Sequence, residues 1–397
     1  MEDSAVIPSL LPVFSRINLS FEKGEGAYLF GSDGRRYLDF ASGIAVTALG
    51  HAHPHLVAAL KAAAEKPWHV SNLYEIPEQT RLADRLVANS FADTTFFCNS
   101  GAEALECGIK MIRKYHAAHG HPEKYRMISI QGAFHGRTLA TIAAGGQEKY
   151  LAGFGPKVDG FDQVAFGNLN ELRAAITPQT AGIMIEPVQG EGGARANSAE
   201  YLQALRQVCD EFGLLLLFDE VQCGMGRSGK LFAYEGANVA PDVMALAKGL
   251  GGGFPVGACL ATERAASGMT AGVHGTTFGG NPLAMAMGNA VLDVLLEPGF
   301  LPHVVAAAEK LRHGLAKIVA DNPAVYAEVR GQGLLTGLRC VVPNGEVQTR
   351  LREQGLLTVA AGDNVVRLLP PLTIGDAEIQ EALAAIKAVA SAWVVQA

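Results

Sequence analysis

The chain has 397 residues, of which 49% are hydrophobic and 18% are charged, and its formal net charge is −7. This length allows two or three domains with a large core, and the negative charge argues against a nucleic-acid partner. No apolar run approaches the roughly 18 residues of a membrane span. The N-terminus, MEDSAVIPSLLPVFSRINLSF, has two early acids and no cationic leader, which predicts a cytoplasmic protein without a targeting segment or membrane anchor.

The chain divides into three zones. Residues 1–55 contain a hairpin signal, because two alternating apolar segments, 26–30 and 36–40, flank an SDG turn. Residues 56–290 alternate helical periods with short apolar strands, which is typical of a large, mostly parallel α/β domain. Residues 291–397 mix helix and strand signals and predict a smaller α+β domain, to which the first zone contributes the N-terminal part.

Short apolar runs are the expected strands of the large domain, at 94–98, 126–130, 182–185, 214–218 and 256–261. One helix is expected to begin after the cap Asn197-Ser198 and to end at Gly213. In the last zone the pattern predicts a helix at 301–319, strands near 326–339 and 365–369, and a closing helix from residue 376.

Cysteine and histidine spacing indicates neither disulfides nor a metal. The histidines of GHAHPH and HGH have no second ligand cluster at a familiar spacing, so we predict no metal site. The cysteines form no CxxC pair, and we interpret them as buried free thiols. They are Cys98, Cys107, Cys209, Cys223, Cys259 and Cys340.

Two apolar segments end on residues that could do chemistry. The run 214–218 ends on Asp219 and Glu220, and the segment 243–247 ends on Lys248, which glycines follow. Ligands bind at the carboxyl ends of strands in an open α/β sheet, and a lysine in apolar surroundings can lose its proton and form a Schiff base. An amine and a carboxylate together are typical of pyridoxal phosphate chemistry. A helix cap and a solvated lysine are the plainer alternatives.

Three further segments are candidates for contacts with such a cofactor. NSGAEA, with Gly101-Ala102, follows a strand and opens a helix, as a phosphate site made of backbone amides would. In AFHGRT, Phe134 could stack on an aromatic ring and Arg137 could hold a carboxylate. The loop HGTTFGGNP offers the hydroxyls of Thr276 and Thr277. Each segment alone could equally be a helix cap, core packing, a surface ion pair or a flexible loop.

Together these motifs resemble the class III pyridoxal-phosphate aminotransferases, and most closely the group among them that acts on N-acetylornithine. The resemblance covers nearly the whole chain, on GSDGRRYLDFASGIAV, NSGAEA, FHGRT, EPVQGEGG, LLFDEVQCGMGRSG, ALAKGLGGGFPVG, HGTTFGGNP, VRGQGL and RLLPPL. It implies the aspartate-aminotransferase-like fold (fold type I), which has a large cofactor domain and a smaller α+β domain. It also implies a homodimer with shared active sites.

The resemblance assigns cofactor roles where the motifs match. Lys248 is expected to form the Schiff base and Asp219 to meet the pyridine nitrogen. The other expected cofactor contacts are phosphate binding by the Gly101 and Ala102 amides, stacking by Phe134 in front of the ring and Val221 behind it, contact of Gln222 with the ring hydroxyl, and contact of Thr277 with the phosphate of the neighbouring subunit's cofactor.

The resemblance also assigns substrate roles. Arg137 is expected to clamp the carboxylate of the acylated amino acid, with Thr276 near the substrate. Arg367 is expected to bind the α-carboxylate of glutamate or 2-oxoglutarate, and Glu191 to pair with that arginine while the first substrate reacts at its terminal amine. A glutamate that neutralises Arg367 and then moves aside lets one pocket accept both substrates.

The resulting prediction is an aminotransferase of arginine biosynthesis. It would move the terminal amino group of N2-acetylornithine to 2-oxoglutarate, giving N-acetylglutamate 5-semialdehyde and glutamate. Succinylornithine, succinyl-diaminopimelate, ornithine and 4-aminobutyrate are alternative donors, and an aminomutase of the same fold is an alternative enzyme. A nucleotide-binding oxidoreductase is disfavoured, because GLGGG follows a lysine and lacks the GxGxxG order.

Overall fold

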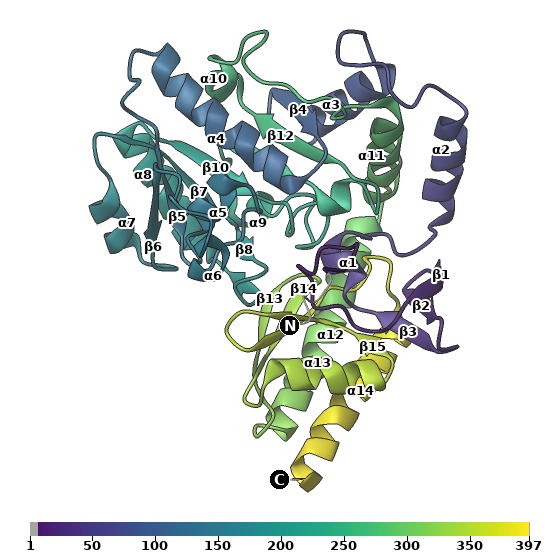
Figure 1. Cartoon of the computed structure of the whole chain (residues 1–397). Coiled ribbons are helices and arrows are strands. Elements are labelled where there is room, and N and C mark those ends of the chain that lie inside the picture. Colours follow the sequence, from purple (N-terminus) through teal and green to yellow (C-terminus); the bar gives the residue numbers. More distant parts are fainter. Residues whose placement is uncertain (1–6, 397) are drawn as a thin grey trace, which may run out of the picture.

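A seven-stranded sheet is the central element of the computed structural model, which describes residues 7–396 (Figure 1). The two early acids, Glu2 and Asp3, on which the leader prediction depends, lie outside these residues. The strand order is β4-β12-β11-β10-β7-β5-β6. Only β12 runs antiparallel to its neighbours; the other pairs are parallel. The strands are β4 (Thr94–Cys98), β5 (Arg126–Ile130), β6 (Phe161–Val164), β7 (Thr180–Ile185), β10 (Leu215–Asp219), β11 (Val243–Leu246) and β12 (Gly257–Ala261).

The leucine run of β10 is buried on both faces of the sheet. Leu215 and Leu217 enter the apolar cluster beneath α4 (Gly101–Ala118), whereas Leu216 and Phe218 enter the cluster that contains the inner side of α8 (Ala199–Phe212). Successive side chains of a strand point to opposite faces, so a strand covered on both sides needs apolar residues at every position. The predicted strand is therefore confirmed, and it delivers Asp219 at its carboxyl end.

Helix α8 has the ends that its sequence predicts. The Ser198 side chain accepts a hydrogen bond from the Tyr201 amide at the N-terminus, and Gly213 closes the C-terminus in the left-handed conformation, with φ 63°. The other helices before residue 296 are α1 (Ser42–Ala45), α2 (Pro54–Ala64), α3 (Pro77–Ala88), α5 (Leu139–Gly145), α6 (Glu148–Leu151), α7 (Leu169–Ala175), α9 (Tyr234–Ala237), α10 (Glu263–Ala266) and α11 (Pro282–Leu295).

Two four-stranded sheets lie outside the central one. The first has the order β1-β2-β3-β15, so the predicted hairpin β2/β3 near the N-terminus pairs with β15 close to the C-terminus. The second, β13-β14-β17-β16, is antiparallel. The strands are β1 (Phe21–Glu25), β2 (Tyr28–Gly31), β3 (Arg36–Asp39), β13 (Tyr326–Gln332), β14 (Leu335–Cys340), β15 (Leu356–Leu357), β16 (Val359–Ala361) and β17 (Val365–Leu368); a two-stranded pair, β8 (Val188–Gln189) and β9 (Arg195–Ala196), completes the set.

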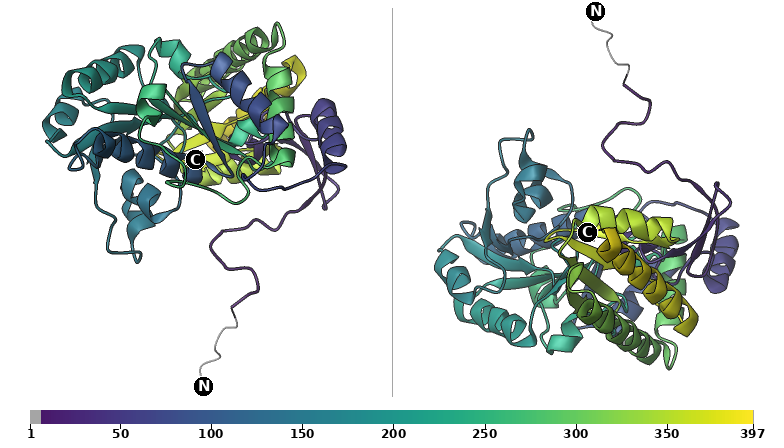
Figure 2. Two further views of the ribbon diagram at one scale, coloured as in Figure 1. Left: turned by 90° about the horizontal axis from the view of Figure 1, so that it is seen from above. Right: turned by 90° about the horizontal axis from the view of Figure 1, so that it is seen from below.

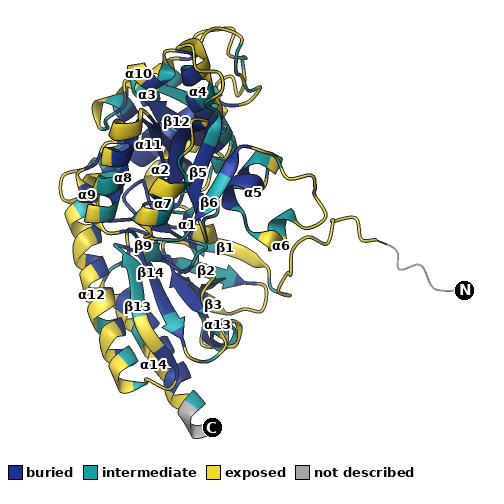
Figure 3. Ribbon diagram, turned by 90° about the vertical axis from the view of Figure 1, so that its left-hand side faces the viewer, coloured by how far each residue is buried: buried dark blue, intermediate teal, exposed yellow. Residues whose placement is uncertain are grey.

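The helices of the last zone cover these smaller sheets on one side. They are α12 (Phe300–Asp321), α13 (Asn344–Glu353) and α14 (Asp376–Gln396), which confirms the helix predicted at 301–319 and the closing helix. Figure 3 shows that α12 and α14 expose their outer faces, whereas β14 and β17 of the antiparallel sheet are mostly buried. All six cysteines are free and buried, as predicted.

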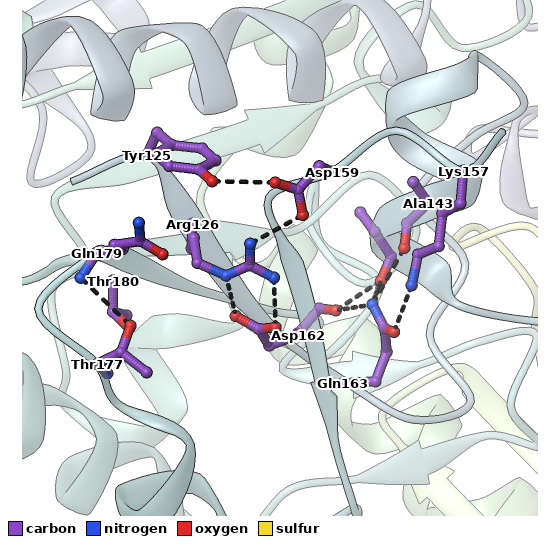
Figure 4. Close-up of polar contacts among 12 residues, drawn as sticks. Tyr125, Arg126, Ala143, Lys157, Asp159, Asp162, Gln163, Thr177, Gln179 and Thr180 are labelled. Atoms are coloured by element: carbon purple, nitrogen blue, oxygen red, sulfur yellow. Dashed lines mark hydrogen bonds and ion pairs between the residues drawn. The ribbon is translucent and has the colours of Figure 1, made fainter. Parts of the chain in front are cut away.

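The edge strand β6 was not predicted from the sequence, and polar side chains account for its place in the sheet (Figure 4). Arg126 of β5 contacts Asp162 of β6 through two nitrogens, at 2.9 and 2.7 Å, and reaches Asp159 at 2.8 Å. A bidentate guanidinium–carboxylate pair has fixed geometry. The pair of Arg126 and Asp162 links β5 to β6, and the sequence of β6, FDQV, has only a short apolar pattern.

The N-terminal segment before β1 extends away from the rest of the protein (Figure 2). Its large apolar side chains are exposed, among them Leu10, Leu11, Val13 and Phe14. Exposed apolar side chains that follow one another along a segment are typical of a contact region.

Candidate functional site

Asp219 and Lys248 meet at the carboxyl edge of the central sheet. Asp219 is the last residue of β10, and it lies opposite Ala245 of the parallel strand β11, three residues before Lys248. Lys248 opens a short 3-10 helix with φ +44°, a conformation that non-glycine residues rarely adopt and that is concentrated at functional sites.

Both side chains line a cavity of about 310 Å³. Predicted and unpredicted residues share its wall: Val46, Asn99, Ser100, Gly101, Ala102, Leu105, Phe134, His135, Gly136, Glu186, Glu191, Asp219, Val221, Gln222, Ala247, Lys248, Gly253, Phe254, Pro255 and Val256. The cavity thus brings together the amine of Lys248, several carboxylates, the apolar side chains of Phe134 and Val221, and the N-terminus of α4.

His135 holds Asp219 in place. Its Nδ1 lies 2.7 Å from Asp219 Oδ2, and the Val221 amide donates to Oδ1 at 3.0 Å. Both side chains are almost fully buried. Burial lowers the pKa of His135, but the hydrogen bond and negative charge of Asp219 outweigh burial and leave that pKa raised. His135 thus orients the Asp219 carboxylate, although the sequence had assigned His135 no role.

Burial lowers the pKa of Lys248, and the nearby carboxylates of Glu191 and Asp219 oppose this shift only in part. A lowered pKa increases the fraction of neutral amine at a given pH. A neutral primary amine is the form that condenses with an aldehyde.

The N-terminus of α4 forms an anion cradle at one end of the cavity. Ser100 caps the helix by accepting from the Glu103 amide, while Gly101 and Ala102 face the cavity. The first amides of a helix have no intrahelical acceptor, and the helix dipole favours an anion there. A Cβ placed on Gly101 would lie 2.7 Å from a methyl carbon of Val221, so only glycine allows this close approach.

Arg367 and Glu191 form an ion pair at the other side of the cavity. Arg367, on β17, is fully buried, and its Nη2 lies 2.7 Å from Oε1 of Glu191, whose side chain is 25% exposed. Arg367 also donates from Nη1 to Gln222 Oε1 at 2.9 Å. Gln222, expected to meet a ring hydroxyl, is therefore also bound to the arginine.

Phe134 and Val221 both face the cavity, but four predicted site residues are not part of its lining in the described chain. One is Arg367, which contacts the lining residues Glu191 and Gln222; the others are Arg137, Thr276 and Thr277. Arg137 is exposed, and its guanidinium lies over the Tyr150 ring, 4.0 Å from the centroid. Thr276 accepts from the Asn99 side chain at 3.3 Å, and Thr277 is exposed.

Glu186 was not predicted, and it follows β7 at the same edge of the sheet. Its side chain is buried, and each oxygen accepts one backbone amide, from Phe134 at 2.9 Å and from Gly190 at 3.1 Å. Burial, with the charge of Asp219, raises the pKa of Glu186 to about 7.

The contents of the cavity fit pyridoxal phosphate. A glycine-lined helix N-terminus suits its phosphate, a buried carboxylate suits a protonated ring nitrogen, and a lysine of lowered pKa suits its aldehyde. An α/β fold with these groups at the carboxyl edge of its sheet defines a pyridoxal-phosphate enzyme of fold type I.

Comparison with known proteins gives the family. A model of the family "Aminotransferase class-III" matches residues 13–390. The chain belongs to the class-III aminotransferases, whose members are pyridoxal-phosphate-dependent transaminases. Membership of this family also excludes the alternative function of a nucleotide-binding oxidoreductase, which the GLGGG segment had suggested.

Curated relatives and solved structures agree with the family. The chain is similar to the acetylornithine aminotransferase of Mesorhizobium japonicum, with 64% identity over 380 residues, which are 96% of this chain and 95% of that protein. The ornithine aminotransferase structure from Toxoplasma gondii ME49 matches with a TM-score of 0.94 and 28% identity, over 98% of this chain and 94% of that one. The N-acetylornithine aminotransferase structure from Stenotrophomonas maltophilia K279a matches with a TM-score of 0.85 and 38% identity, over 96% and 98%. The expected fold is confirmed.

Nowhere in residues 7–396 do three or more His, Cys, Asp or Glu side chains gather so as to hold a metal ion. No single helix of this part is long and apolar enough to cross a membrane; α11 and α12 meet that test only as a pair, bent by 72°.

Proposed function

We propose that this transaminase moves the terminal amino group of N2-acetylornithine to 2-oxoglutarate, giving N-acetylglutamate 5-semialdehyde and glutamate, in arginine biosynthesis. The relatives that match it at 60–64% identity over most of its length are named acetylornithine aminotransferases, which supports this donor. The observation that carries the proposal is the ion pair of Glu191 with the buried Arg367.

The ion pair explains how one pocket accepts two different substrates. The donor presents an ω-amine without a neighbouring carboxylate, so Glu191 stays on Arg367 and neutralises a guanidinium that has no exposed surface. 2-Oxoglutarate brings its own α-carboxylate, which replaces Glu191. Because Glu191 is partly exposed, its side chain can turn toward solvent while the arginine stays fixed.

Residues of this chain position the chemistry and move the proton. When bound, pyridoxal phosphate supplies an electron sink and carries the amino group between substrates. Lys248 holds the cofactor and then shuttles a proton at its Nζ. Asp219, fixed by His135, would keep the ring nitrogen protonated, and Phe134 and Val221, which both line the cavity, would contact the ring.

Substrate residues outside the cavity lining complete the proposal. Arg137, at the exposed end of the FHGRT segment, clamps the carboxylate of the acylated donor. Thr277 reaches the phosphate in the active site of a second copy of the chain, and Thr276 lies near that site's substrate. The exposure of Thr277 in a single chain supports a homodimer with shared sites. We further propose a cytoplasmic enzyme with domain boundaries near residues 55 and 290.

A donor scan tests the function. The cofactor-loaded enzyme is mixed in single turnovers with N-acetylornithine, succinylornithine, ornithine or 4-aminobutyrate, and the conversion to its amine form is followed by absorbance. We expect N-acetylornithine to react fastest and free glutamate to appear when 2-oxoglutarate is then added. Equal or faster reaction of ornithine would contradict the donor, since ornithine aminotransferases share this fold; amino transfer without release of glutamate would indicate an aminomutase.

A further inference from the structure

Glu186 is a buried carboxylate to which the family resemblance gave no role. Its side chain lies in the cavity wall, and its two oxygens are each bound to one main-chain amide, at 2.9 and 3.1 Å. Hydrogen bonds to an ionised acceptor are stronger than those between neutral groups. The carboxylate therefore ties together the two segments to which those amides belong.

The two segments carry different parts of the active site. The amide of Phe134 belongs to the segment that holds the ring-stacking side chain and, next to it, His135, the partner of Asp219. The amide of Gly190 belongs to the residue immediately before Glu191. A single side chain thus joins the segment of Phe134 to the loop that bears Glu191. We call Glu191 and its partner Arg367, which lies on β17, the carboxylate gate.

The main chain at the gate is held from several sides. A Cβ on Gly190 would lie only 2.0 Å from Oε1 of Gln222, the atom that accepts from Arg367. On the far side, the Gly362 amide donates to the carbonyl of Glu191 at 2.8 Å. With the backbone fixed on both sides, only the side chain of Glu191 is left to move.

We propose that Glu186 is a positioning residue that fixes the distance between the Phe134 wall and the Glu191 backbone, so that the gate works by side-chain rotation alone. This rests on the proposed function, which gives Glu191 its gating role. Without the tie, the Glu191 loop shifts and the guanidinium of Arg367 is less well neutralised. The donor half-reaction then suffers more than the dicarboxylate half-reaction, for which Glu191 must leave in any case.

Glu186→Gln tests the tie, because a carboxamide has one acceptor oxygen and cannot serve both amides. Glu220→Gln is the matched control: Glu220 is also buried and also accepts two amides, from Ala233 and Tyr234, in another segment. Hydrogen exchange is measured on the cofactor-free proteins near pH 8.5, where a carboxyl of pKa about 7 is ionised.

We expect faster exchange in peptides 131–137 and 188–193 for Glu186→Gln, and in peptide 232–236 for Glu220→Gln. Equal exchange in all three peptides for both variants, or unchanged exchange at 188–193 in Glu186→Gln, would overturn the proposal. Glu186→Asp keeps the charge but is one methylene shorter. If the glutamine variant does not fold, the aspartate variant is expected to raise exchange in at least one of the first two peptides, and no rise in either would count equally against the tie.

Single turnovers of the cofactor-loaded variants add a functional readout. The ratio of donor to dicarboxylate kcat/KM is expected to fall about tenfold in Glu186→Gln, in line with one lost hydrogen bond to a charged acceptor, and to stay unchanged in Glu220→Gln. An unchanged ratio in both variants would refute the coupling to the gate. The exchange experiment uses no substrate, so a wrong donor assignment appears as a slow wild-type reaction and leaves the exchange result intact.

Discussion

Replacing Glu191 by glutamine should strengthen the binding of dicarboxylates. Glu191 lies 2.7 Å from the fully buried Arg367, and in the proposed function an incoming α-carboxylate displaces it. A hydrogen bond to a charged group contributes about 1.5–3 kcal/mol, and the 25% exposure of Glu191 places this pair at the lower end. Because about 1.4 kcal/mol is a factor of ten, removing the competing charge should raise dicarboxylate affinity about tenfold.

The assay is a single turnover of the amine form of the enzyme against increasing 2-oxoglutarate, with the apparent Kd taken from the rate. The same variant should react more slowly with N-acetylornithine, because the guanidinium is then left without its counter-charge. Glu328→Gln is the control, since Glu328 forms an exposed ion pair with Arg330 at 2.6 Å and exposed pairs contribute little. Unchanged or weaker dicarboxylate binding in Glu191→Gln, with a normal donor reaction, would refute a gate that works by charge competition.

Three further predictions concern the cofactor, the clamps and stability. Lys248→Ala should abolish turnover, and borohydride reduction followed by peptide mapping should find the adduct on Lys248 in the wild type only; an adduct elsewhere would contradict its role. Arg137→Ala should mainly weaken the donor half-reaction and Arg367→Ala the 2-oxoglutarate one, and a swapped or uniform pattern would mean that the clamps are misassigned. Burial raises the pKa of Glu220 to about 8, so between pH 4.5 and 8 the folded protein keeps a proton on Glu220 that the unfolded chain has lost. The stability that this protonated carboxyl contributes is fully present below the unfolded pKa of 4.5 and is lost as the pH rises toward 8. The melting temperature of Glu220→Gln should therefore fall less with rising pH than that of the wild type, and parallel profiles would rule out this titration.

The strands of the central sheet were predictable where both faces are buried. Leu215 to Phe218 needs apolar side chains at every position, so a continuous run reports the strand directly. β6 is different, because FDQV contains Asp162 and Gln163. Its pairing with β5 is accompanied by the contact of Asp162 with Arg126, 36 residues earlier in the chain, and no local pattern reports a contact over that separation.

The same contrast separates the predicted from the missed parts of the site. Lys248 and Asp219 each follow or end an apolar segment, so they were candidates from position alone, and the family resemblance added Glu191 and Arg367. His135 lies within a recognised motif, yet its partner Asp219 is 84 residues away. Tyr150, whose ring lies beneath the guanidinium of Arg137, belongs to the short helix α6 and has no motif of its own.

Strand register supplies the link that would have found Glu186. In the parallel pair of β7 and β10, Ile185 lies opposite Phe218, so the next residue of each strand, Glu186 and Asp219, emerges side by side at the carboxyl edge. Two carboxylates this close repel each other, which contributes to the raised pKa of Glu186. The pKa of His135 is raised in turn, because the hydrogen bond to Asp219 and the negative charges of Asp219 and Glu186 favour its protonated form. Glu186 follows a buried strand directly and is in register with Asp219, the acid proposed to meet the cofactor's ring nitrogen. It is therefore more than a strand-end cap, because its charge is coupled to that of Asp219 in the cavity wall.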